Sequence, residues 1–432
     1  MKRNQNLTKL ASLFIAAPVF GLSFANSCYA GSFQIEEAAK LAPATPAKAE
    51  TPSATDDAAG PAKVSAPEAV KSAKPQLALA QQKKLAAELF DLTKTAKSSK
   101  QLTAMITKCD SVVTAGLNEK YFAYVRSLKA WALTRRGNNR YETAKQLKAI
   151  DNVAQYRIAF EQAINDFNES ISIDTARCRT FNARGIAFVL NEQYVKATQD
   201  FTKAVGLKAD FTQGYFNRAE VLSAMGKYEL AVKDYTTLLR LTPDDAQAMT
   251  GRGHANVALK KYEAALTDFN VVIKAYPNNV VAWVNRGDCH AAAGDWELSL
   301  ADYASAKKLT DANQLAGGST KLADLVDQRT AWVLATASDA SIRDAEQAIA
   351  LIKPCVDRSN SPTVAMLETL GAAQAGTGAF DEAKESQSQV IKLAGAEVSE
   401  DESSPHQIRM ALYEEEKAYV QEKSKLSLTP QK

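Results

Sequence analysis

Few residues of this 432-residue chain are arranged as a reactive site would arrange them. Gly317-Gly318-Ser319-Thr320 is similar to a phosphate-binding loop, but it contains no lysine and follows no strand pattern, so we interpret it as a linker between helical segments. The sequence has no His-Glu-x-x-His metal helix and no nucleophile elbow. We therefore predict no enzyme activity and no cofactor, and keep catalysis as a remote alternative.

The acidic runs and the histidines point to no site either. Glu400-Asp401-Glu402 and Glu414-Glu415-Glu416 lack a neighbouring group or an apolar pocket that would raise the pKa of a carboxyl group, so solvated helix ends explain them. His254 has no recognisable partner in the sequence, and we interpret it as an exposed helical side chain rather than a pH-sensitive contact.

Four cysteines follow the amino-terminal region, and none of them forms a Cys-x-x-Cys pair or has a histidine at metal-ligand spacing. We predict no metal site. A free cysteine behaves as a small apolar residue, so buried free thiols are the favoured interpretation, and one long-range disulfide of unassigned pairing is the alternative. The four residues are Cys109, Cys178, Cys289 and Cys355.

Residues 1–30 have the order of a secretory signal peptide. Three basic residues precede an uncharged apolar run, and Cys28-Tyr29-Ala30 supplies the small-x-small cleavage pattern. Pro18 and Gly21 interrupt the apolar run, which is shorter than the roughly 20 residues of a membrane-spanning helix. We therefore expect an exported protein, periplasmic or extracellular. Lipidation of Cys28 with membrane attachment is the alternative, although the branched aliphatic residue usual three places earlier is missing.

The charge balance makes nucleic acid an unlikely class of partner. Removing residues 1–30 lowers the basic residues from 52 to 49 and leaves the 49 acidic ones, so the processed chain is formally neutral. Proteins that bind nucleic acid normally carry a basic excess that neutralises phosphates.

Residues 31–80 differ sharply in composition from the rest of the chain. Six of the thirteen prolines fall here, alanine dominates, and Phe33 is the single aromatic residue. Such a segment cannot bury enough apolar surface to offset the entropy lost on ordering, so we predict a disordered linker.

From Gln81 onward the apolar residues follow a helical spacing, as in Leu85, Leu89 and Leu92. Long alternating runs typical of strands are missing, and two helices joined at Ser98-Ser99 are expected before Gly116. The sequence therefore predicts an all-α fold.

The strongest pattern lies in residues 175–311, where residue types recur every thirty-four positions through four consecutive units. The recurring columns are small (Gly185, Ala219, Gly253, Gly287), aromatic (Tyr194, Tyr228, Tyr262, Trp296; Phe201, Tyr235, Phe269, Tyr303), aromatic or methionine (Phe181, Tyr215, Met249, Trp283), arginine (Arg184, Arg218, Arg252, Arg286) and, in the second helix, mostly alanine (Ala197, Ala231, Ala265, Ser299).

This period with these columns resembles the tetratricopeptide (TPR) repeat family. The resemblance implies an α-solenoid, a right-handed superhelix in which each unit is an antiparallel pair of helices, A and B. In the second unit we expect helix A over about 213–225, a turn at Gly226-Lys227, and helix B over 228–241, ended by Pro243. The small residues let the helices approach closely, and the aromatics fill the space between units.

The arginine column has two interpretations. In the repeat pattern this position faces inward, so we favour side chains whose stems cover the core and whose guanidinium groups are held by neighbours. A ladder of cations for an anionic ligand is the alternative.

Less regular units flank the clear ones. We assign residues 81–174 to helical pairs with a divergent repeat, in which about twenty residues are inserted between helix A and helix B. Residues 319–394 are assigned to divergent carboxyl-terminal units, and residues 395–432 to a capping helix and tail that starts at Ser404 and Pro405.

The resemblance also implies a binding surface on the concave face, formed by helices A. Such a surface receives a segment of a partner protein or peptide, so we expect a non-catalytic protein-binding scaffold of the cell envelope, without small-molecule cofactors. A membrane-attached envelope assembly factor is the alternative. The family's groove positions correspond here to Asn182, Ile186, Phe216, Glu220, Thr250, His254, Val284 and Asp288.

Overall fold

The computed structural model describes residues 77–315, 320–395 and 404–421. These residues form seventeen α-helices and no strand, which confirms the predicted all-α fold. The predicted signal peptide, Cys28, most of the predicted linker and Gly317-Gly318-Ser319 lie outside the described residues.

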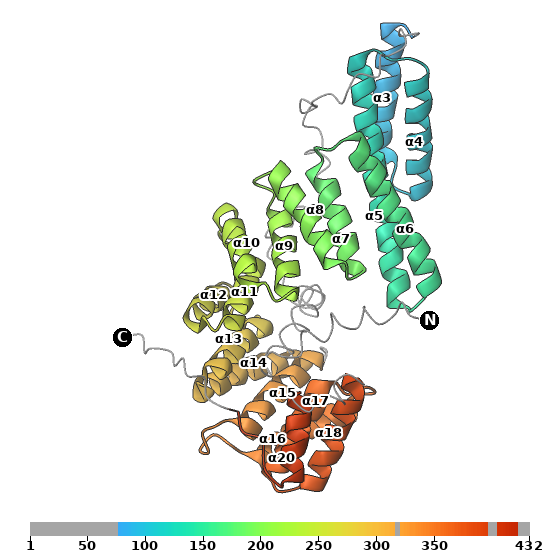
Figure 1. Cartoon of the computed structure of the whole chain (residues 1–432). Helices are drawn as coiled ribbons and strands as arrows, with labels where there is room; N and C mark the ends of the chain where they lie inside the picture. Colours follow the sequence, from blue (N-terminus) through green and yellow to red (C-terminus); the bar gives the residue numbers. More distant parts are fainter. Residues whose placement is uncertain (1–76, 316–319, 396–403, 422–432) are drawn as a thin grey trace. The chain divides into compact units, whose positions relative to one another are not determined.

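The chain divides into two compact units, whose described parts are residues 77–221 and 222–421, so that the division falls within helix α9. The first unit consists of antiparallel neighbours, among which α5 is much the longest (Figure 1). Its helices are α3 (Leu79–Thr95), α4 (Ser99–Thr114), α5 (Glu119–Ala149), α6 (Val153–Ile173), α7 (Cys178–Leu190), α8 (Tyr194–Leu207) and most of α9 (Thr212–Ala224).

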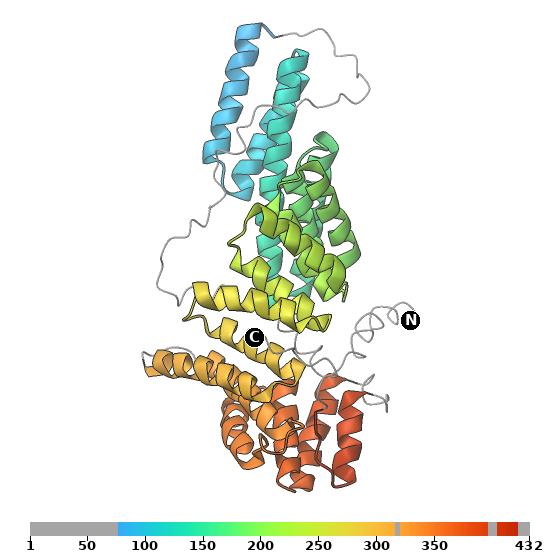
Figure 2. The same ribbon diagram turned by 90° about the vertical axis from the view of Figure 1, so that its left-hand side faces the viewer.

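The second unit continues with helix pairs of similar length, and its last helices gather into one bundle (Figure 2). These helices are α10 (Tyr228–Leu241), α11 (Ala246–Ala258), α12 (Tyr262–Ala275), α13 (Val280–Ala293), α14 (Trp296–Leu315), α15 (Lys321–Thr336), α16 (Ala345–Arg358), α17 (Val364–Gly376), α18 (Phe380–Ala394) and α20 (Pro405–Glu414).

Local sequence explains where the helices begin and end. Asp245 caps α11 by accepting a hydrogen bond from the Ala248 N–H, and Asn279 caps α13 in the same way. Gly226 has a φ of +70°, the left-handed conformation expected at the end of helix A, and α10 ends at Leu241, two residues before Pro243. The expected boundaries of this hairpin are confirmed within two residues.

In three of the four regular hairpins, the small residue of helix A lies against an aromatic ring of helix B. A Cβ atom built on Gly185 would lie 2.6 Å from the Phe201 ring, and the same distance separates such an atom on Gly253 from Phe269. Only a hydrogen fits at these glycines, because real Cβ contacts do not come so close. Tyr235 packs in the corresponding way between hairpins, since its ring would be 2.5 Å from a Cβ atom on Gly251 of the next helix A.

Helices α5 and α6 form a repeat-like hairpin of unusual length. The Phe167 ring covers Gly137 as Phe201 covers Gly185, but the two residues are 30 positions apart instead of 16. Fourteen residues are therefore inserted, not about twenty, and they are helical. Each helix of the pair extends about two turns further than its counterpart in α7 and α8.

Candidate protein-binding surface

The arginines of the repeat column are held by aspartates of their own hairpins. Arg184 donates from Nε and Nη2 to the two carboxylate oxygens of Asp200, at 2.8 and 2.7 Å. Two further pairs repeat this bidentate geometry at 2.6 to 2.9 Å, and each joins residues sixteen positions apart: Arg252 with Asp268 and Arg286 with Asp302. The aspartates are buried, with 4–5% of their surface exposed.

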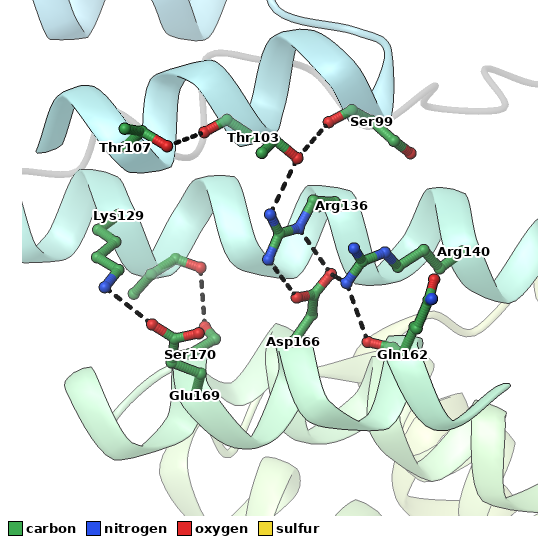
Figure 3. Close-up of polar contacts among 11 residues, drawn as sticks. Ser99, Thr103, Thr107, Lys129, Arg136, Arg140, Gln162, Asp166, Glu169 and Ser170 are labelled. Atoms are coloured by element: carbon green, nitrogen blue, oxygen red, sulfur yellow. Dashed lines mark hydrogen bonds and ion pairs between the residues drawn. The ribbon is translucent and has the colours of Figure 1, made fainter. Parts of the chain in front are cut away.

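The long α5–α6 hairpin contains the same arrangement with one cation more (Figure 3). Arg136 binds both carboxylate oxygens of Asp166, at 3.0 and 2.6 Å, and Arg140 binds one of them at 2.7 Å. Arg136 also donates to the Thr103 hydroxyl of α4 at 3.0 Å. A single guanidinium therefore joins helices α4, α5 and α6.

The same bridging recurs between consecutive hairpins. Arg184 Nη1 donates to Asn168 at 2.7 Å, and Arg286 Nη1 donates to Asn270 at 2.7 Å, in each case to the preceding helix B. Arg218 reaches Thr202 and Arg252 reaches Thr236 over the same interval of sixteen residues. Each arginine thus supports the joint between one hairpin and the one before it.

These contacts decide between the two interpretations of the arginine column. The guanidinium carbon of Arg184 lies 5.7 Å from the Phe181 ring centroid, and that of Arg286 lies 5.0 Å from the Trp283 ring centroid. Together with the aspartates, the rings enclose the cationic heads. The inward, structural interpretation is confirmed for these arginines, and the ladder of free cations is not supported.

Two columns of residues that bind these arginines were not identified from the sequence, although both repeat every thirty-four residues. One is the aspartate column, Asp200, Asp234, Asp268 and Asp302, and the other is the polar column, Asn168, Thr202, Thr236 and Asn270. A comparison of residue types at intervals of thirty-four would have identified both columns. Polar residues on helix B look like ordinary solvent-facing positions until the arginine opposite is placed.

In the first unit, the predicted binding residues differ in exposure. Asn182 is 5% exposed, and its side-chain carbonyl accepts a hydrogen bond from the Asn217 amide at 2.9 Å, so it joins α7 to α9. Ile186, Phe216 and Glu220 are half-buried. Their binding role stays a prediction, and among the predicted residues of this unit the half-buried three are those that a partner can reach.

In the second unit, the predicted residues fall into two groups. Thr250 and His254 are half-buried on α11, and the His254 ring lies 5.6 Å from the Phe269 ring. Val284 and Asp288 are only 3% and 4% exposed.

Helix α15 is the reason for this burial. It brings Val326 and Val333 into the apolar cluster of Val284, and the Nε atom of Arg329 lies 3.2 Å from the Asp288 carboxylate. The Tyr303 hydroxyl donates to Asp288 at 2.6 Å. The structure therefore places these two residues in the packing between helices rather than on an accessible surface.

The four cysteines after residue 76 are free thiols, and three of them are buried. Burial raises the pKa of Cys109 to about 12 and that of Cys355 to about 11, so both are neutral at ordinary pH. Cys178 is half-buried, and burial raises its pKa as well. The expectation of free thiols is confirmed for these residues.

Two further observations concern the described part of the chain. It contains no group of three or more His, Cys, Asp or Glu side chains placed to hold a metal ion. None of its helices combines the length and the apolar character needed to cross a membrane.

Comparison with known proteins agrees with the repeat pattern. Residues 216–280 match the family model described as tetratricopeptide repeat. This match covers α10, α11, α12 and parts of the flanking helices, and the glycine–aromatic and arginine–aspartate contacts described above recur on both sides of it.

Several solved structures are similar to parts of the chain. A tetratricopeptide repeat protein from Parabacteroides merdae is 16% identical, with a TM-score of 0.49 over 64% of this chain and 99% of that one. The carboxyl-terminal part of a TPR repeat-containing protein from Cytophaga hutchinsonii is 15% identical, with a TM-score of 0.43 over 66% and 98%. YrrB, a TPR protein with an unusual peptide-binding site, is 20% identical, with a TM-score of 0.34 over 41% and 88%.

Proposed function

We propose that this chain, whose residues 216–280 match the tetratricopeptide repeat model, is a non-catalytic scaffold of the cell envelope that holds a partner polypeptide against its helices A. Repeat folds of this kind serve generally as protein-interaction scaffolds. The observation that carries the proposal for this chain is the half-exposed group of Ile186, Phe216 and Glu220, on two consecutive helices A of one unit.

The character of this group suits a polypeptide. An isoleucine and an aromatic ring offer apolar contact to a partner side chain, and Glu220 offers a carboxylate to a main-chain N–H or a basic residue. Arg184, beside Ile186, is paired with Asp200, and Arg218, beside Phe216, donates a hydrogen bond to Thr202, so both of these cations are engaged within the protein. A partner recognised here combines apolar side chains with donors of hydrogen bonds.

The first test is crosslinking in cells with a photoreactive amino acid at position 216. We expect it to capture a specific polypeptide, and we expect Phe216→Ala and Glu220→Lys to reduce association with that polypeptide about tenfold each, as for central residues of an interface. Both substitutions should leave the circular dichroism spectrum and the melting temperature nearly unchanged, because neither residue is part of the buried core.

Val195 provides a matched control. It is apolar, 60% exposed and lies on α8, a helix B, whereas the predicted surface is formed by helices A. A photoreactive residue there should not capture the same polypeptide, and Val195→Ala should not affect association. Equal capture from both positions, or an unchanged association of Phe216→Ala, would contradict the assignment of the binding surface to helices A.

The envelope location is part of the proposal, and the order of basic residues, apolar run and small-x-small pattern in residues 1–30 supports it. Sequencing the amino terminus of the protein isolated from cells should give Gly31. An intact Met1 would contradict export, whereas a lipid-modified Cys28 retained in the membrane fraction after a high-salt wash would establish the attached alternative.

A further inference from the structure

Among the described residues, helix α20 is not followed by a second helix that would complete a pair. Helix α20 begins with Ser404 as its N-cap, and its Tyr413 is buried with Ala375 and Ala383 of the preceding hairpin. The turn after α20 has the geometry of a turn between helices A and B. The Lys417 N–H donates to the Leu412 carbonyl at 2.8 Å, as the Gln193 N–H donates to Phe188 at 2.9 Å.

Glu416 has the positive φ of that turn as well, 54° against 58° for Glu192. Helix B begins directly afterwards in the regular repeats, at Tyr194 for example, but residues 417–421 are not helical. The segment that would begin helix B lies instead against an earlier hairpin.

Tyr419 and Gln421 make the contacts of this segment. The Tyr419 ring lies 6.0 Å from the Trp332 ring of α15, and the guanidinium of Arg409 lies 5.5 Å from the centroid of the same tyrosine ring. The Gln421 N–H donates to the Thr336 carbonyl at 2.6 Å. Tyr419 also packs against two apolar clusters that contain alanines of α17. The segment therefore lies over α15 and α17, both of which are helices A.

Three contacts between consecutive helices A show which residues occupy equivalent positions in different hairpins. They are the pairs Asn182 with Asn217, Gln328 with Thr369, and Glu368 with Arg409. Gln328 and Glu368 thus occupy the position of Asn182 in their own hairpins. Four residues further on, one turn along the same face, Trp332 and Ala372 occupy the position of Ile186.

Residues 417–421 consequently contact a surface equivalent to the one proposed above for a partner. The surface has a recognisable chemistry. Trp332 offers an aromatic face, Arg409 a cation and Thr336 a main-chain carbonyl. Arg409 is 1% exposed and paired with Glu368, and its Nε and Nη1 atoms have no hydrogen-bond partner. The Tyr419 ring therefore covers the guanidinium group of this buried arginine.

We propose that residues 417–421 are a built-in ligand of the α15–α17 surface, and that an extended segment of a partner with a tyrosine-like aromatic side chain binds there in their place. This inference rests on the proposed function, since it uses the same face of the repeats. A tethered segment has an effective concentration of about a millimolar, so a partner competes with it and binds the full chain more weakly than the uncovered surface.

The test uses a fluorescent peptide with the sequence of residues 415–421, Glu-Glu-Lys-Ala-Tyr-Val-Gln. Its binding is measured by anisotropy on the full chain and on a chain that ends at Glu415. We expect the shortened chain to bind the peptide at least tenfold more tightly than the full chain does, and a peptide with serine in place of tyrosine not to bind.

A full-length variant keeps the test informative if the shortened chain does not fold. Tyr419→Ser with Gln421→Pro removes the ring and the main-chain donor while retaining α20, and it should also bind the peptide more tightly than the unmodified chain. A folded variant that fails to bind the peptide, or a full chain that binds it equally well, would overturn the proposal. The crosslink at Phe216 is a separate readout, so failure of one proposal is distinguishable from failure of the other.

Discussion

The arginine–aspartate pairs show how charged residues serve packing in this molecule. Arg252 and Asp268 make two parallel hydrogen bonds, and the exposed fraction is 26% for the arginine side chain but 5% for the aspartate side chain. The aspartate depends on its partner more than the arginine does, because a guanidinium on a long stem can turn to water and a buried carboxylate cannot. The hydrogen bond to Asp268 raises the pKa of Arg252.

We expect Arg252→Ala to destabilise the protein by about 3 kcal/mol, and by more than Asp268→Ala does, because it leaves a buried carboxylate unpaired. The double variant should lose less than the sum of the two single losses, with a coupling of about 1–3 kcal/mol in urea unfolding. The pair of Lys384 and Asp381, whose side chains are 35% and 93% exposed, is the control, and it should show no measurable coupling. Additive losses for Arg252 and Asp268 would mean that the pair is not cooperative.

At the scale of the element, close packing of one glycine against one aromatic ring joins the two helices of several hairpins. This contact has no spare room, as the 2.6 Å between a Cβ atom built on Gly253 and Phe269 shows. Gly206 in α8 is the opposite case, since nothing lies within 4 Å of a Cβ atom built there. Close packing therefore requires a glycine at Gly253, whereas it does not require one at Gly206.

Gly253→Leu should therefore lower the free energy of unfolding by about 3 kcal/mol, because the Phe269 ring must leave its place. Gly206→Leu should leave it unchanged or raise it slightly, because leucine has the better helix propensity and meets no neighbour. Chemical denaturation of both variants checks this. Equal losses at the two positions would show that helix propensity, and not close packing, sets the cost.

At the scale of the whole molecule, the principal contacts within each unit join helices that are one or two places apart in the chain. Stability in such repeat arrays is approximately a sum of each hairpin and its neighbour contacts, so damage in one hairpin spreads over a short distance. The hydrogen bond from Gln421 to Thr336, which spans 85 residues, is a departure from this rule at the carboxyl-terminal end of the described chain.

Hydrogen exchange measured by mass spectrometry tests this local behaviour with two reciprocal variants. Gly137→Leu displaces the Phe167 ring and should speed exchange in α5, α6 and their neighbours, while α16 to α18 keep their rates. Gly287→Leu displaces the Tyr303 ring and should speed exchange in α13 to α15, while α3 and α4 keep theirs. Faster exchange throughout the chain in either variant would indicate a single cooperative unit.

Residue type and period were sufficient to predict the regular features of the repeated part of this protein. The helix pairs, the turn at Gly226 and the inward role of the arginines are local or near-neighbour features, and each recurs every thirty-four residues. Such features depend on contacts of fixed separation along the chain, so a single regular column is enough to predict them.

Where the spacing departs from that period, only the tertiary structure showed which residues are in contact. Asp288 meets Arg329 at an interval of 41 residues, so no thirty-four-residue column could reveal that α15 buries it. Tyr419 is expected from the sequence on a last helix that covers the end of the stack, but this helix ends at Glu414, and only the fold places Tyr419 against Trp332 of α15. Contacts between such distant residues depend on how the irregular hairpins pack, which no local pattern records.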